Sequence, residues 1–197
     1  ASAKMKVGPT DGMGSAHPDM GPLVSKEHLD KVRSMINKGE KEGAKVALDG
    51  RNIEAAKSSG FFLGPTILDH AKPEMSIVKE EIFGPVLSVV RVDSLDEALA
   101  IGRDCPYGNG AVMYTNSGRS AREFKHHFNA GMIGINVGVP APMAWFPFTG
   151  WNSSFYGDLH IQGSEGIQFY TQQKMTMTRW FEPKSSKFQD PIWKPKN

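Results

Sequence analysis

Residues 79–85 read KEEIFGP. They place two adjacent carboxylates, Glu80 and Glu81, and an aromatic residue, Phe83, directly before a Gly-Pro turn. The apolar run at 86–92 follows at once. A carboxylate accepts hydrogen bonds from both hydroxyls of a diol, and an aromatic ring two residues later can cover a flat ring. The segment therefore indicates a site for a ligand that carries both groups. The simpler alternatives are a solvated Glu81 beside a solvated Glu80, and a Phe83 that only packs in the core.

The elements around this segment follow from capping residues and apolar spacing. Residues 86–92 are nearly all apolar, which predicts a strand buried on both faces. Helices are expected after the N-caps Ser25, Ser94 and Ser117, and further strands at 45–48, 61–68, 111–115 and 132–136. The order strand, helix, strand, helix, strand over 86–136 implies parallel strands joined by right-handed crossovers, and thus an α/β fold.

The last third of the chain departs from this alternation. Residues 137–166 are rich in Gly, Pro, Ser and large aromatics that require burial, which predicts an ordered loop forming the wall of a ligand site. Residues 167–180 alternate apolar and polar side chains, which predicts a half-buried strand that could pair with another subunit's sheet. Residues 181–197 are expected to form a tail.

Composition excludes several classes of protein. The chain has 197 residues, a formal net charge of +2, 39% hydrophobic and 22% charged residues, as in soluble globular proteins. The scattered lysines predict no nucleic-acid partner, and no apolar run is long enough to predict a membrane span. A single cysteine excludes an internal disulfide framework and favours a reducing compartment.

Other chemistry-bearing residues give weaker signals. Cys105 precedes a proline in a loop, with only Arg103 as a basic neighbour, so we interpret it as an ordinary cysteine. His126 and His127 are adjacent and point in different directions on a helix, so they do not predict a metal site. No metal is assigned.

The segment KEEIFGPV at 79–86 resembles a signature of the aldehyde dehydrogenase superfamily, and the resemblance extends over most of the chain. Further similar segments lie at 19–23, 64–67, 106–110 and 166–171. The late loop reads FPFTG at 146–150, where most of the superfamily has Pro-Phe-Gly-Gly. With SSFYGD at 153–158 and GINV at 134–137, it is similar to the methylmalonate-semialdehyde dehydrogenase branch.

The resemblance implies roles for four residues. Glu81 would bind the two hydroxyls of the nicotinamide ribose of NAD, and Phe83 would pack on the nicotinamide side. Phe148 and Asn136 would line the aldehyde pocket, although Phe148 as core filler is the alternative. Residues 1–160 would be the later part of the catalytic α/β domain, 161–180 the oligomerisation strand segment and 181–197 the tail.

The resemblance also implies an activity for the complete enzyme. Malonate and methylmalonate semialdehydes would be oxidised with NAD, with CoA as co-substrate, giving acyl-CoA and CO2. The family's nucleophile, a cysteine in a Gly-Gln-x-Cys setting, and its general-base glutamate do not occur here, so no catalytic residue is assigned. The chain alone is expected to be inactive and to need the missing N-terminal half.

The expected assembly is a homo-oligomer formed through the strand at 167–178. The cytoplasm, or the mitochondrial matrix in a eukaryote, is the expected location. Two alternatives stay open at this point. The first is that the chain is a truncated paralogue that associates with full-length subunits without catalysis. The second is that it is part of an aldehyde dehydrogenase with another substrate.

Overall fold

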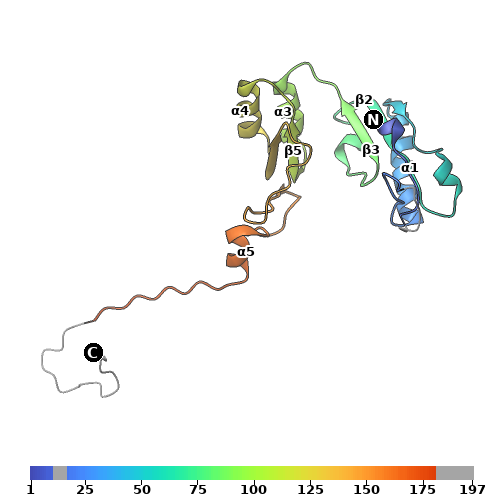
Figure 1. Ribbon diagram of the computed structural model, residues 1–197. Coiled ribbons are helices and arrows are strands. Elements are labelled where there is room, and N and C mark those ends of the chain that lie inside the picture. The colour runs from blue at the N-terminus through green and yellow to red at the C-terminus, as the bar shows by residue number, and fades with distance from the viewer. Residues whose placement is uncertain (11–16, 181–197) are drawn as a thin grey trace, which may run out of the picture. The chain divides into compact units, whose positions relative to one another are not determined.

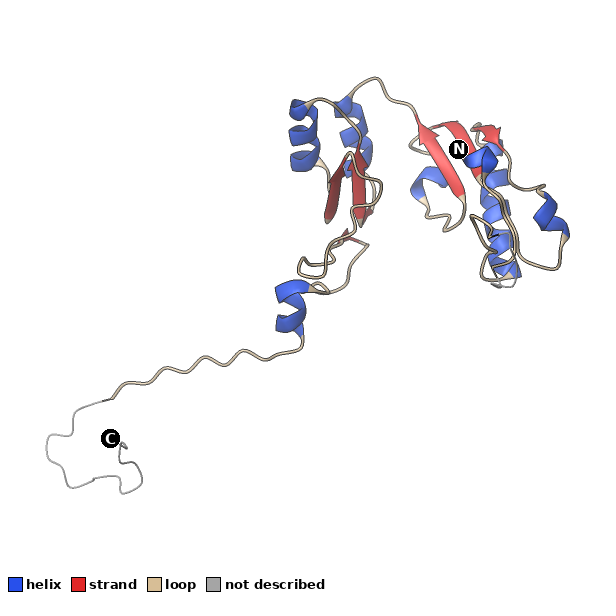
Figure 2. Cartoon of the chain, in the orientation of Figure 1, coloured by secondary structure: helices blue, strands red, loops and turns tan. Residues whose placement is uncertain are grey.

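The computed structural model describes residues 1–10 and 17–180 (Figure 1), so the predicted tail at 181–197 lies outside the described residues. The chain divides into two compact units. The first contains Ala1–Ala141 and Thr149–Tyr156, and the second contains Pro142–Phe148 and Gly157–Asn197. Helices and strands alternate along the first unit (Figure 2), as predicted for an α/β fold.

The first sheet of unit 1 has the strand order β1 (Lys45–Leu48), β2 (Thr66–Ala71), β3 (Val86–Val90). Strand β1 is antiparallel to β2, whereas β2 and β3 are parallel and are joined through the short helix α2 (Ser76–Lys79). The long helix α1 (Lys26–Lys41) precedes the sheet, and the Ser25 hydroxyl caps it by accepting the His28 backbone N–H at 3.2 Å. Two short 3-10 turns, Ser2–Lys4 and Glu54–Lys57, complete this part.

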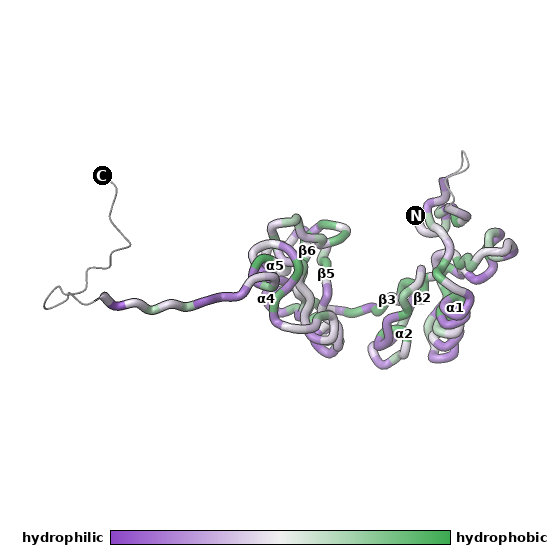
Figure 3. Tube along the Cα trace, turned by 90° about the horizontal axis from the view of Figure 1, so that it is seen from below, coloured by the Kyte–Doolittle hydropathy of each residue, from purple (hydrophilic) through white to green (hydrophobic). Residues whose placement is uncertain are grey.

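The core of this part lies between α1 and the sheet. The apolar face of α1 contributes the fully buried Val32 and Ile36, and β2 contributes the fully buried Leu68. Figure 3 shows hydrophobic stretches in β2 and β3 and polar residues along much of α1. One stripe of the helix therefore faces the sheet, as its spacing predicts.

The second half of unit 1 is a separate βαβ arrangement. Its helices and strands are α3 (Leu95–Arg103), β4 (Tyr107–Gly108), β5 (Gly110–Met113), α4 (Gly118–His127), β6 (Met132–Ile135) and β7 (Trp151–Asn152). Strands β5 and β6 pair in parallel, and β4 pairs antiparallel with β7. Ser94 and Ser117 cap α3 and α4 as predicted, by accepting the backbone N–H three residues on.

Two expectations for the strand at 86–92 are wrong. Strand β3 ends at Val90, and it is not buried on both faces, because Leu87 is 58% exposed. Strand β3 is also the edge of its sheet and is not hydrogen-bonded to β5. The alternating order is present, but the strands lie in separate sheets, because no other strand in the described residues pairs with the free edge of β3.

The expectation of a strand beginning at residue 167 is also wrong, because α5 (Gly163–Phe169) is helical. In its first turn the Glu165 carboxylate accepts the His160 backbone N–H at 2.8 Å and lies 2.7 Å from His160 Nδ1. These contacts, the backbone N–H first, lower the pKa of Glu165. Residues 171–180 form neither helix nor strand, are exposed, follow α5 as an elongated trace (Figure 1) and pair with no strand of the described chain.

The aromatic residues of the late loop are not buried as expected. Trp145 is 74% exposed and Tyr156 is 96% exposed. Phe146, Phe148 and Trp151 are exposed too. Side chains of this size are normally covered in a finished fold, so this chain presents apolar surface that fits a further partner.

A close backbone crossing in unit 1 makes Gly50 irreplaceable. A Cβ atom at Gly50 would lie 1.9 Å from the Gly64 carbonyl oxygen, which is part of the backbone and cannot rotate away. The Gly64 N–H also donates to the Gly50 carbonyl at 2.9 Å. We expect Gly50→Ala to lower the free energy of unfolding by about 1–3 kcal/mol, measured by urea denaturation. Gly118→Ala, where the nearest atom is a flexible arginine end at 3.6 Å, is the matched control and should change it little.

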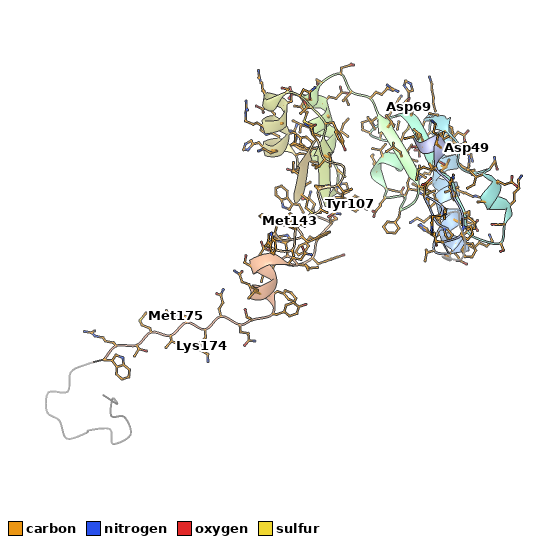
Figure 4. The ribbon with its side chains drawn as sticks, in the orientation of Figure 1. Asp49, Asp69, Tyr107, Met143, Lys174 and Met175 are labelled. Atoms are coloured by element: carbon orange, nitrogen blue, oxygen red, sulfur yellow. The ribbon has the colours of Figure 1, made fainter. Side chains whose placement is uncertain are left out.

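A salt bridge between Asp69 of β2 and Arg91, directly after β3, makes the free energy of unfolding depend on pH. The Arg91 guanidinium donates to both Asp69 oxygens at 3.0 and 2.6 Å and, with the His70 backbone N–H, lowers the pKa of Asp69 to about 2. Figure 4 labels Asp69 on its strand. The folded pKa lies below the unfolded one, so this stabilisation is present above about pH 4 and is lost as the pH falls towards 2.

We therefore expect the difference in free energy of unfolding between the wild type and Arg91→Leu to shrink as the pH falls from about 4 towards 2, measured by urea denaturation. Arg103→Leu removes an exposed arginine that makes no ion pair with the described residues, and should give a small difference without this dependence. An Arg91→Leu difference that stays constant down to pH 2 would contradict the assignment.

Candidate functional site

The loop at residues 80–85, between α2 and β3, is fixed on the hydrophobic core at its centre. Ile82 is only 6% exposed and belongs to the buried cluster that includes Val32. A Cβ atom at Gly84 would lie 2.9 Å from both Val32 methyl groups, so the backbone itself runs against α1. The Thr66 N–H donates to the Pro85 carbonyl at 2.8 Å and ties the end of the loop to β2.

Phe83 leaves this loop in an unusual conformation. Its φ is +55°, which is rare for a bulky residue and costs about 1–3 kcal/mol. Phe83 is 75% exposed, so burial of its ring does not supply this energy, and Phe83 is not part of the core of the described residues. A strained, exposed aromatic of this kind is typical of ligand sites.

His28, in the first turn of α1, contacts Phe83 twice. Its Nε2 lies 2.7 Å from the Phe83 carbonyl oxygen, and the two rings meet edge to face with centroids 6.1 Å apart. A carbonyl oxygen only accepts, so His28 Nε2 carries the proton and donates. The sequence analysis missed this role, since 55 residues separate the partners and no local pattern signals it.

The two carboxylates of the loop differ in their partners. Glu80 forms an ion pair with Lys38 of α1, with Lys38 Nζ 3.4 Å from Glu80 Oε1. Glu81 is exposed, and no hydrogen bond or ion pair engages its carboxylate within residues 1–10 and 17–180. Glu81 is therefore the acceptor that is open to a ligand, two residues from the exposed Phe83 ring.

Asn136 directly follows β6 and closes the carboxyl ends of β5 and β6. Its side-chain amide donates to the Thr115 carbonyl at 2.9 Å and accepts the Thr115 N–H at 2.8 Å. Its φ of +56° is one that asparagine tolerates well. This pairing shapes the turn, and the sequence analysis did not anticipate it.

Phe148 belongs to unit 2, whereas Glu81, Phe83 and Asn136 belong to unit 1. Its N–H donates to the Ile161 carbonyl at 2.7 Å, and its side chain is 43% exposed. This backbone hydrogen bond connects the two chain segments of unit 2, and it leaves the Phe148 ring accessible.

The remaining candidates supply no further centre. Cys105 is free and half-buried, and no group of three or more potential metal ligands occurs among the described residues. None of the helices in the described part of the chain has the length and hydrophobicity of a membrane-spanning segment.

Comparison with known proteins identifies the class. The sequence pattern of the aldehyde dehydrogenase family matches residues 1–176. The chain therefore belongs to the aldehyde dehydrogenase family, as its signature at 79–86 suggested, and the α/β fold with parallel strands is that of its structural neighbours.

The matches also confirm the resemblance to one branch. The chain is 53% identical to a malonate-semialdehyde dehydrogenase of Halalkalibacterium halodurans over 161 residues, which cover 82% of this chain. A methylmalonate-semialdehyde dehydrogenase from Oceanimonas doudoroffii is 41% identical with a TM-score of 0.86, over 92% of this chain and 37% of the other. A Sinorhizobium meliloti protein provisionally assigned the same activity, and solved in complex with NAD, is 42% identical with a TM-score of 0.84, at the same coverage.

The chain spans only part of these relatives. It covers 33% of the length of the Halalkalibacterium halodurans protein.

Proposed function

We propose that this chain is the nicotinamide-ribose-binding part of an NAD-dependent, CoA-acylating dehydrogenase of malonate or methylmalonate semialdehyde. The observation that carries the proposal is the loop at 80–85, where the unengaged Glu81 carboxylate stands beside the exposed Phe83 on a backbone fixed to the core. The similarity to malonate- and methylmalonate-semialdehyde dehydrogenases supports the choice of substrate.

The residues of the loop fit NAD. A free carboxylate can accept hydrogen bonds from the two ribose hydroxyls, and a 75% exposed aromatic offers an apolar face to the nicotinamide. NAD supplies the hydride acceptor of the reaction. Glu81 and Phe83 bind and orient it, and the buried Ile82 between them keeps that orientation fixed.

For the aldehyde, we propose that Asn136 of unit 1 and Phe148 of unit 2 each contact the substrate in the complete enzyme. Asn136 fixes the turn at the ends of β5 and β6 through Thr115, and Phe148 offers an accessible ring. The rest of the complete enzyme supplies the nucleophile, the general base and the remainder of the NAD site, so the chain alone is inactive. CoA receives the acyl group and CO2 leaves.

Glu81→Gln in the complete enzyme tests the cofactor role. The neutral amide loses the charge-assisted hydrogen bonds to the ribose, so we expect KM for NAD to rise by roughly 10- to 100-fold. Steady-state kinetics with malonate semialdehyde gives both constants.

Glu80→Gln is the matched control, because Glu80 pairs with Lys38 instead of standing free. We expect it to change KM for NAD by less than about threefold. Equal effects of the two substitutions, or none from Glu81→Gln, would refute the assignment.

We also propose that residues 171–180 join subunits of a homo-oligomer by strand pairing. The segment is extended and exposed, and Met175 and Met177 on one face are 79% and 84% exposed. Lys174 and Met175 project to opposite sides of it (Figure 4), so the alternation of side chains puts Met175 and Met177 together on the side opposite Lys174. An isolated strand with such a face gains stability by adding to a sheet.

The double substitution Met175→Asp and Met177→Asp tests this pairing in the complete enzyme. Buried charges on the apolar face should dissociate the oligomer, which sedimentation velocity would show as smaller species. Thr176→Asp with Thr178→Asp places the same charges on the opposite face and should preserve most of the assembly. An unchanged sedimentation coefficient for the methionine variant would rule out this interface.

A further inference from the structure

We propose that His28 is a positioning residue for NAD, which holds the backbone of Phe83 in the conformation that presents the Phe83 ring. This inference rests on the proposed function of the loop. It assigns to α1 a part in cofactor binding that acts through the loop backbone.

The conformation of Phe83 needs an external restraint. Its φ of +55° is unfavourable for a bulky side chain, and its ring is 75% exposed, so core packing does not hold it. The Phe83 carbonyl, in contrast, has a specific partner in His28 Nε2 at 2.7 Å. The restraint therefore acts through the backbone and leaves the Phe83 side chain largely exposed.

His28 is itself held in place, as a positioning residue must be. Its backbone N–H donates to the Ser25 hydroxyl at the helix cap, and its neighbour Leu29 is 8% exposed within the core. The imidazole therefore projects from the anchored first turn of α1. Its edge-to-face contact with the Phe83 ring further limits the directions the ring can take.

The loop is pinned on both sides of Phe83 by other contacts. Ile82 is buried before it, and Gly84 runs against Val32 after it. Between these points the Phe83 peptide can still rotate, and the His28 bond opposes that rotation. Without the bond the φ of Phe83 relaxes towards ordinary values and the direction of the Phe83 ring changes, while the buried Ile82 keeps Glu81 in place. The loss falls on NAD affinity, while the aldehyde side is unaffected.

Three substitutions in the complete enzyme separate positioning from simple packing. His28→Leu keeps the apolar contact and removes the donor. His28→Gln places an amide N–H where Nε2 stands, and His28→Asn carries the same amide one methylene shorter, out of reach of the carbonyl. We expect Leu and Asn to raise KM and the calorimetric Kd for NAD by about fivefold to tenfold, with KM for the aldehyde unchanged. His28→Gln should restore values within about twofold of the wild type.

Lys41→Leu is the matched control, since it adds the same leucine at the exposed far end of α1 and should leave all constants unchanged. Thermal unfolding of each variant excludes a loss of fold, and the comparison of His28→Gln with His28→Asn remains decisive if His28→Leu is unstable. Equal losses in both amide variants, or a matching rise in KM for the aldehyde, would overturn the proposal.

The outcomes also separate the two proposals. If Glu81→Gln weakens NAD binding while the His28 variants do not, the ribose role stands and the positioning role fails. If neither weakens it, the proposed function itself fails.

Discussion

The burial of Ile82 against α1 is the contact on which the candidate site depends. In the loop at 80–85, Ile82 is the buried residue and its two neighbours Glu81 and Phe83 are exposed, so placing Ile82 in the core turns both neighbours outward. The close approach of Gly84 to Val32 then fixes the depth of the backbone, and His28 fixes the direction of one peptide. The site is therefore a consequence of how one apolar side chain packs under a helix.

Much of this arrangement was predictable from local sequence. The caps at Ser25, Ser94 and Ser117, the apolar face of α1 and the parallel pair around α4 all follow short-range rules, and all are present. The segment at 79–85 also pointed to Glu81 and Phe83 by type and spacing. Local patterns suffice where neighbours in sequence are also neighbours in space.

The failures have causes that the periodicity of the sequence does not contain. The apolar run of β3 predicted burial on both faces, but burial needs a strand on its free edge that the described residues do not provide. The alternation from residue 167 suggested a strand, yet the contacts between His160 and Glu165 begin a helix there. The contacts of His28 with Phe83 and of Asn136 with Thr115 join distant segments, so periodicity could not reveal them.

The central claim is that Glu81 and Phe83 hold the nicotinamide ribose of NAD, and a crystal structure of the complete enzyme with NAD tests it most directly. The account predicts both ribose hydroxyls within hydrogen-bond distance, about 2.5–3.2 Å, of the Glu81 carboxylate, and the nicotinamide against the Phe83 ring. A bound NAD whose ribose contacts other residues, with Glu81 turned to solvent, would contradict it.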